Sequence, residues 1–498
     1  MTTTEGAETA YGRAPWFVTL FMTDTWERFG FYALQAILVL YATASKPSGG
    51  LGLASGWAAG LFAIWIGLTF MLALPGGWIG DRLLGQRRTI MTGLGLIALG
   101  HFALAVPVSW FSAVGICLVA LGTGLYKPNH QAVLNTMLGQ QAGRRESGIS
   151  VIFVGMQVSA LLAPLIVGYV GERINWHLAF AIAGVALSVG FLIFVFARNR
   201  FFGDIGVAPG RPLADRERRR VGWIVLAVVV VLAALVLVHP PFPAVMGIFG
   251  LIAIVSPFVA YSQLRRHRDL TAFDRRKLRG FLWLLLGATT FWALITQDGT
   301  SLNLFARDHT DRSVFGFVLP ASWLQSATPL FILVLAPVLA WLLPKIRSRT
   351  AIPVKLSVGL LMGGVSFLLM AGAAALAVQG VRVSPGWLLG TYLLHACGEV
   401  VVSAVAISAA ADVLPRRFLG HTIGLFWLFA ALGGSLGGTL VQVESVVPMP
   451  AYFLAFAIVP TVLCVVFAVR RKKIAEALSP QDDQPVPETV RPAAAELS

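Results

Sequence analysis

The chain has 498 residues, of which 57% are hydrophobic and 12% are charged, and its formal net charge is +15. An ordinary soluble domain carries about 25% charged residues and cannot keep so many apolar side chains away from water. The composition therefore excludes a soluble globular protein and indicates an integral membrane protein whose outer surface faces the lipid bilayer.

Apolar segments recur from Phe17 to Val469, and each is near the roughly 20 residues with which a helix crosses the hydrocarbon core. The polar residues before Phe17 show no signal-peptide pattern. We predict an all-α membrane protein with 14 transmembrane helices, at residues 17–42, 54–79, 88–107, 111–136, 149–171, 176–198, 221–238, 243–263, 281–306, 321–344, 351–379, 386–411, 420–442 and 449–470.

The seventh and eighth segments are almost purely aliphatic and contain no intramembrane charge. This pattern indicates two lipid-facing helices inserted between two six-helix bundles, because transporters are commonly built from two related halves with the site between them. The predicted parts are a cytoplasmic N-terminus (1–16), a first six-helix bundle (17–198), a linker with the inserted pair (199–280), a second bundle (281–470) and a cytoplasmic tail (471–498).

Positive charge alternates along the connections between these segments. Basic clusters such as 216–220, 265–277 and 470–473 alternate with nearly uncharged connections such as 106–109 and 445–450. By the positive-inside rule both termini are expected in the cytoplasm, in a multi-pass protein of the cell membrane, and the basic charge does not indicate nucleic-acid binding. Cys117, Cys397 and Cys464 lie isolated in apolar segments, so no metal, cofactor or disulfide is expected.

Ionisable residues inside the apolar segments carry the functional signal, since each costs about 2.5 to 3.5 kcal/mol at the bilayer centre. Asp24, Glu27 and Arg28 follow one another at helical spacing, and Tyr32 and Gln35 continue the same face. This polar stripe must look into the protein interior or an aqueous cavity.

Three more such residues lie in later segments: Lys127 in GTGLYKPNH, Asp298 in ITQDGTSLN and Glu399 in HACGEVVVSA. Lys127 and Glu399 are predicted to pair across the two halves, because each would otherwise be an isolated charge in a low dielectric. A static ion pair that fixes helix register is the alternative for any one pair. Ionisable groups in both halves favour transport.

The turn after the second segment, GGWIGDRLLGQRR, resembles the loop signature of the major facilitator superfamily. Its charges are expected to act in gating at the inward face, together with Lys127. These turn residues are Asp81, Arg82, Arg87 and Arg88.

Further motifs resemble one branch of that superfamily, the proton-dependent oligopeptide transporter family. The matching stretches occur in order along the whole chain: DTWERFGFY, GGWIGDRLLGQRRTI, LGTGLYKPN, the FW of 291–292, SLNLFA, PASWLQS and the GE of 398–399. The resemblance implies a monomeric proton-coupled symporter that imports di- or tripeptides, or a peptide-like zwitterion, by alternating access.

The same resemblance assigns roles to individual residues. It places proton coupling at Asp24, Glu27, Arg28 and Glu399, the peptide carboxylate at Lys127 and the peptide amino group at Glu399. The substrate-binding residues that it implies are Arg28, Tyr32, Gln35, Phe70, Lys127, Gln157, Trp292, Thr296, Thr328, Glu399, Ser403, Phe426 and Trp427.

Departures from the family pattern gather where the ligand would lie. A cation expected at Gln35 and a glutamate expected at Thr296 are both missing, so one salt bridge between the halves is predicted to be a neutral contact. Asp298 lies about 200° from Thr296 around a helix and is not expected to replace the glutamate unless the helix is unwound there. Other departures are Asp24, Phe31, Phe70, Gln157, Thr328 and an exchange of Trp and Phe at 426–427.

Two other functions stay open at this point. A proton antiporter that exports hydrophobic drugs or metabolites would share the turn motif but would not need a cation and an anion for a zwitterion. A non-transporting membrane receptor would keep the fold without flux. An enzyme is not expected, because the segments contain no nucleophile constellation, metal cluster or phosphate loop.

Overall fold

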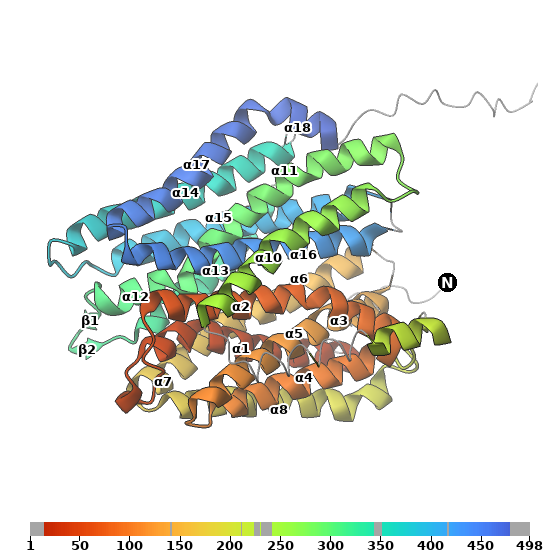
Figure 1. Cartoon of the computed structure of the whole chain (residues 1–498), viewed down its shortest axis with the longest axis horizontal. Helices are drawn as coiled ribbons and strands as arrows, with labels where there is room; N and C mark the ends of the chain where they lie inside the picture. The colour runs from red at the N-terminus through yellow and green to blue at the C-terminus, as the bar shows by residue number, and fades with distance from the viewer. Residues whose placement is uncertain are drawn as a thin grey trace, which may run out of the picture.

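The computed structural model describes residues 14–139, 142–210, 212–223, 230, 242–342, 351–415 and 418–478. Long helices dominate these ranges, and their only sheet is one short antiparallel hairpin. Figure 1 shows the helices running nearly side by side, with N-terminal helices (red to yellow) below and C-terminal helices (cyan to blue) above. The predicted all-α membrane fold is confirmed.

The N-terminal half packs its helices around α1 and α5, which are the longest in it. Apolar side chains at helical spacing form these segments, and Gly or Pro residues divide the second and fifth into shorter pieces. The elements are α1 (Pro15–Thr43), η2 (Lys46–Ser48), α2 (Ser55–Met71), α3 (Ala73–Ile79), η3 (Gly80–Leu84), α4 (Gln86–Leu104), α5 (Ser109–Leu138), α6 (Ala142–Ala163), η4 (Pro164–Gly168), α7 (Tyr169–Arg173) and α8 (Trp176–Phe201).

The C-terminal half repeats this plan, with a break inside its first span. The helix changes to a tighter 3₁₀ turn over Thr296–Gly299 before it continues. The elements are α11 (Ala272–Ile295), η5 (Thr296–Gly299), α12 (Ser301–Asp308), β1 (Ser313–Val314), β2 (Phe317–Val318), η6 (Ala321–Ser326), α13 (Ala327–Leu342), α14 (Ala351–Ala377), α15 (Gly386–Asp412), α16 (Leu419–Leu440), η9 (Val441–Ser445), α17 (Met449–Val469) and α18 (Arg471–Leu478).

One inserted helix, α10 (Phe242–Arg265), lies between the halves and contacts α16 and α2, one from each of them. It is the least buried of the ten described spans that are long and apolar enough to cross a membrane, since only 22% of an 18-residue apolar stretch of this helix is buried. This agrees with a lipid-facing insertion. The other predicted inserted helix, 221–238, lies largely outside the described residues.

The remaining predicted spans each have a described counterpart within a few residues, except at the start of α11. This helix begins at Ala272, well before the predicted residue 281, because Thr271 and Asp274 form a reciprocal capping box. The sequence predicts the basic residues after Asp274 to be part of the linker, but in the structure they extend the helix beyond the apolar segment.

The two halves are joined at the end of the molecule that carries β1 and β2, which we call the hairpin end; both described chain ends lie at the opposite end (Figure 1). Arg307 Nη1 donates to Thr43 Oγ1 over 2.6 Å, and Asn303 Nδ2 donates to the carbonyl of Ala36 over 2.8 Å. From the indole of Trp323 a further bond reaches the carbonyl of Leu165. These bonds close the hairpin end.

Glycines set how closely the helices approach inside each half. A Cβ added to Gly433 of α16 would lie 2.3 Å from the carbonyl oxygen of Thr289 in α11, and one on Gly437 would lie 2.5 Å from that of Ala293. Such contacts are with backbone atoms, which cannot rotate away. Glycine is therefore required at this crossing.

Gly433→Ala is expected to destabilise the protein by about 1 to 3 kcal/mol, because the added methyl group forces α11 and α16 apart. The matched control is Gly250→Ala in α10, where an added Cβ meets nothing within 4 Å. Melting temperatures of both variants in one detergent test this. Equal melting temperatures would contradict the packing account.

Candidate functional site

The polar stripe of α1 forms a buried ion pair at the centre of the molecule. Arg28 Nε donates to Glu27 Oε2 over 2.5 Å, and the two residues are 4% and 0% exposed. The second carboxylate oxygen of Glu27, Oε1, has no hydrogen-bond partner among the described residues. One oxygen of this carboxylate is thus held by the guanidinium, and the other is open to a proton or a donor.

Asp24, one turn earlier on α1, faces two side chains of α5. Tyr126 Oη donates to Asp24 Oδ1 over 3.3 Å, and His130 Nδ1 lies 3.6 Å from the same oxygen. Tyr126 and His130 also stack, with ring centroids 5.1 Å apart. The predicted polar stripe therefore does face the protein interior, but its first member binds an aromatic pair that the sequence did not single out.

Lys127 lies in an aromatic cage that spans both halves. Its Nζ is 4.9 Å from the ring centroid of Phe70 in α2 and 4.4 Å from that of Trp427 in α16. Those two rings are nearly parallel at 5.4 Å, and Trp292 of α11 packs 5.3 Å from Phe70. Cation–π attraction stabilises the ammonium group, which no carboxylate of the described residues contacts within 4 Å.

The predicted direct pair between Lys127 and Glu399 is wrong for this conformation: no ion pair within 4 Å joins them in the described part of the chain. The physical reason is that the aromatic rings compensate the buried ammonium, and Glu399 has its own neighbours in the C-terminal half. Tyr32 lies within electrostatic range of both Arg28 and Glu399. It therefore marks the place where the charges of the two halves face each other.

In the C-terminal half, Asp298 binds a histidine. Asp298 Oδ1 lies 2.8 Å from His395 Nδ1, and both side chains are buried. The 3₁₀ turn η5 presents Asp298 to α15, which also carries Glu399 one turn beyond His395. The helix is therefore not regular here, which was the condition under which Asp298 could act near Thr296.

The neutral replacements predicted at Gln35 and Thr296 do not bond to each other within the described residues. Thr296 Oγ1 donates to the carbonyl of Trp292 in its own helix, over 2.8 Å. Gln157 and Thr328 are buried, and the hydroxyl of Thr328 has no partner in the described structure. Ser403 is half-buried one turn after Glu399, and Phe426 is buried beside Trp427.

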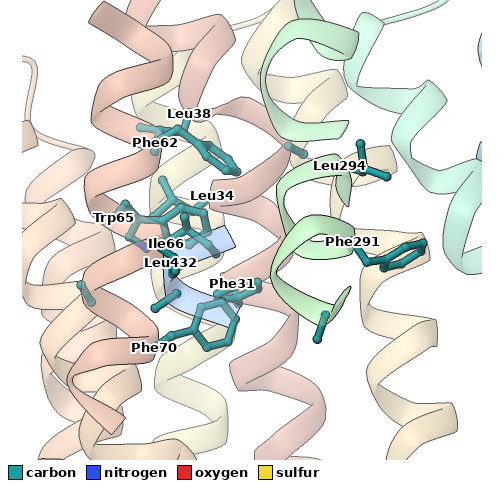
Figure 2. Close-up of a cluster of buried hydrophobic side chains, with 14 of the residues drawn as sticks. Phe31, Leu34, Leu38, Phe62, Trp65, Ile66, Phe70, Phe291, Leu294 and Leu432 are labelled. Carbon is teal, nitrogen blue, oxygen red and sulfur yellow. The ribbon is translucent and has the colours of Figure 1, made fainter. Parts of the chain in front are cut away.

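Figure 2 shows a cluster of buried apolar side chains to which both halves contribute. Phe31, Trp65 and Phe70 lie in the N-terminal half, and Phe291 and Leu432 belong to α11 and α16 of the other half. Phe31 also contacts the Arg28 guanidinium, whose Cζ is 5.1 Å from the ring centroid. Because Glu27 and Arg28 are buried and Phe31 covers the guanidinium, the attraction between the two charges is stronger than it would be in water.

The charged turn of residues 80–88 lies at the end of the molecule opposite the hairpin end. Its side chains bind to residues of the N-terminal half. Arg87 is buried and donates through Nη2 to the carbonyl of Gly203, while its backbone N–H binds Gly206 O over 2.9 Å. Burial lowers the pKa of Arg87, and the nearby Asp204 opposes this shift. Asp81 accepts a bond from Gln86 over 3.3 Å, and Arg88 is exposed. The gating role of Asp81, Arg82, Arg87 and Arg88 stays a prediction.

A clamp at the hairpin end was not found from the sequence. Glu172 of α7 accepts hydrogen bonds from the backbone N–H groups of Ala321 and Ser322 and from the Ser322 hydroxyl, at 2.8, 2.9 and 2.6 Å. Its carboxylate also lies 3.9 Å from Arg312. Burial lowers the pKa of Arg312, and the nearby Glu172 carboxylate opposes this shift. An acidic residue thus caps the start of η6 across the two halves.

Two helical bundles joined around buried ionisable side chains define a secondary transporter of the major facilitator type. The sequence profile of the POT family matches residues 87–454, which is more than half of the chain. The chain belongs to the POT family.

Individual relatives agree along nearly the full length. The "Uncharacterized transporter YclF" of Bacillus subtilis is 33% identical over 91% of this chain and 92% of its own, and the "Di-/tripeptide transporter" of Lactococcus lactis subsp. cremoris is 30% identical over 94% and 97%. A solved peptide transporter POT in complex with sulfate superposes with a TM-score of 0.89 at 32% identity, over 94% of this chain and 96% of that one.

Glu172→Ala is expected to open the hairpin end, because three charge-assisted hydrogen bonds between the halves are lost. A loss of about 1 to 3 kcal/mol raises the open population about 5- to 150-fold. Spin labels at the exposed positions Lys46 and Ser313, in a background without the three native cysteines, report the separation of the halves.

The control is Glu217→Ala, which removes an exposed carboxylate at the other end of the molecule. It should leave the distance distribution as in the parent protein. A Glu172→Ala variant with an unchanged distribution would show that the clamp does not hold the halves together.

Proposed function

We propose that the protein is a proton-coupled symporter that imports di- or tripeptides, or a peptide-like small zwitterion, across the cell membrane by alternating access. The observation that carries this proposal is the separation of unlike charges between the halves. Arg28 and Lys127 belong to the N-terminal half and Glu399 to the C-terminal half, with no ion pair between the halves among them in the described structure. The names of the relatives support peptides as the substrate class.

A dipeptide zwitterion matches this arrangement because its carboxylate and ammonium groups lie at opposite ends. The carboxylate would bind Arg28 and Lys127, and the ammonium group would bind Glu399. Both bonds form together only when the halves approach, so substrate binding favours closure. Tyr32, which interacts electrostatically with both Arg28 and Glu399, would bind the peptide backbone.

Proton coupling would act through the Glu27–Arg28 pair. A substrate carboxylate that draws Arg28 away leaves Glu27 as a buried carboxylate without its cation, which favours its protonated form. By reciprocity, a proton on Glu27 then favours substrate binding. The proton gradient supplies about 2.3 kcal/mol per charge per 100 mV of membrane potential and about 1.4 kcal/mol per pH unit.

The aromatic cage narrows the substrate class. The Lys127 ammonium group lies against Phe70 and Trp427, so a substrate carboxylate that binds Lys127 would have to replace part of these cation–π contacts. Phe31, Phe70 and Thr328 also provide fewer hydrogen-bonding groups than the family pattern, and sites that recognise polar groups lose much affinity when partners are missing. We therefore infer a preference for small, apolar peptides or peptide-like amino compounds.

The hydrogen bonds at the hairpin end support an inward-facing state. If the positive-inside rule places both termini in the cytoplasm, the hairpin end faces outward and is the closed gate. The protein is expected to function as a monomer. A membrane receptor would not need the buried ion pair, and an antiporter would not need a cation and an anion on opposite halves.

Lys127→Ala and Glu399→Gln are each expected to lower the affinity for dialanine about 10- to 100-fold, because each removes a charge-assisted bond to one end of the zwitterion. Purified protein in proteoliposomes with an inward proton gradient measures this as radiolabelled dialanine uptake. N-acetylated dialanine lacks the ammonium group and should therefore bind the parent protein more weakly than dialanine does. The Glu399→Gln variant should bind this compound no more weakly than the parent protein does.

Lys355→Ala serves as the control, because Lys355 lies at the start of α14, away from the site. Full dialanine uptake by both site variants would refute the site. Expulsion of a hydrophobic compound by the same gradient, with no dialanine uptake by the parent protein, would favour the antiporter.

A further inference from the structure

The pair of Asp298 and His395 is a buried acid–imidazole pair that the proposed cycle leaves unused. The two side chains are 8% and 0% exposed, and their contact of 2.8 Å joins η5 to α15. No cation other than the histidine contacts Asp298 among the described residues. Such a pair needs a reason, because a buried carboxylate is costly unless it is compensated.

The protonation of the histidine follows from the geometry. An ionised carboxylate only accepts hydrogen bonds, so Nδ1 of His395 carries the hydrogen that Asp298 binds. In the neutral ring Nε2 then has a free lone pair, and this atom is buried without a hydrogen-bond partner in the described structure. The pair therefore has an open position for one proton, at Nε2, and Asp298 stabilises the imidazolium that forms.

Glu399 is the neighbour that such a proton would affect. It follows His395 by four residues on α15, so their Cβ atoms lie about 5 to 6 Å apart, within reach of one bridging water. Glu399 is also within electrostatic range of both Asp298 and His395. The titratable groups that face the pair from the described elements around it are Glu399 and Tyr392 of α15, Tyr452 of α17 through Gln297, and Tyr32 of α1 next to Glu399.

Two carboxylates in one buried site do not both stay ionised at low cost, so Glu399 and the pair share a proton. When the ammonium group of a substrate binds Glu399, it needs the ionised carboxylate and competes with a proton there. A lone carboxylate would exchange the proton for the amine, which is the stoichiometry of an antiporter. For this proton to travel with the substrate, in addition to the one proposed for Glu27, it needs a second position in the protein while the amine is bound.

We propose that Asp298 and His395 form this second position. When the substrate ammonium group binds, the O–H bond of Glu399 breaks, an N–H bond forms at Nε2 of His395, and the Nδ1–H bond to Asp298 persists. The local charge is then compensated on both sides: the ammonium group by Glu399, and the imidazolium by Asp298. This inference rests on the proposed function, and it assigns a proton-holding role to Asp298 and His395, which the family resemblance does not.

The test uses the full-length protein in proteoliposomes with dialanine as the probe. The double variant Asp298→Asn, His395→Gln replaces the pair by two amides, which can still bond to each other but cannot hold a proton. Counterflow, in which internal dialanine exchanges for labelled dialanine without a gradient, should stay within about twofold of the parent protein. Accumulation driven by a gradient of one pH unit should fall about tenfold, which is the contribution of one proton.

His177→Gln is the matched control. This half-buried histidine bonds the carbonyl of Leu104, and both residues lie in the N-terminal half, away from the Asp298–His395 pair. It should change neither assay, and equal melting temperatures should show that all variants are folded. Accumulation by the double variant equal to that of the parent would overturn the proposal, and so would a parallel loss of counterflow. Absence of counterflow in the parent protein would instead refute peptide transport itself.

Discussion

The cost of an isolated charge in a low dielectric is the constraint on which this structure depends. Three of the buried ionisable side chains have compensating neighbours of different kinds: a cation for Glu27, aromatic rings for Lys127 and an imidazole for Asp298. Aromatic and histidine partners are weaker than a full opposite charge and are therefore easier to replace. In the proposed cycle a substrate would therefore exchange with these partners at a lower cost than with a salt bridge such as Glu27–Arg28.

The halves are joined differently along their length. Backbone and side-chain hydrogen bonds hold the hairpin end, whereas stacked rings of Phe70 and Trp427 connect the halves beside Lys127. Hydrogen bonds are directional and break together when the halves rotate, but apolar ring contacts tolerate sliding. Under the proposed alternating access, this combination favours rocking about the central contact, and the Glu172 clamp would have to break for the hairpin end to open.

The sequence predicted the fold and much of the site, and the failures have physical causes. Hydropathy alone located the described spans, since lipid demands long apolar segments, and the spacing of Asp24, Glu27 and Arg28 correctly predicted an inward-facing stripe. What failed was pairing. The sequence carries no signal that His130 meets Asp24 or that His395 meets Asp298, because these contacts depend on how separate helices are rotated against each other. For Lys127, a carboxylate partner was assumed where aromatic rings suffice.

At Asp298, a local break in the helix changes which residues the side chain can reach, and therefore which interactions can be predicted from the sequence. On a regular helix it would point about 200° away from Thr296 and could not act in the same place. The 3₁₀ turn over Thr296–Gly299 removes that restriction, and the hydroxyl of Thr296 turns back to its own helix. A carboxylate near this level of the bundle is thus present after all, but it faces α15 within its own half and no longer reaches α1. The consequence for the proposed cycle is that a proton could move between Glu399 and the Asp298–His395 pair without breaking a bond between the halves, so that proton movement in this half would be a step separate from closure.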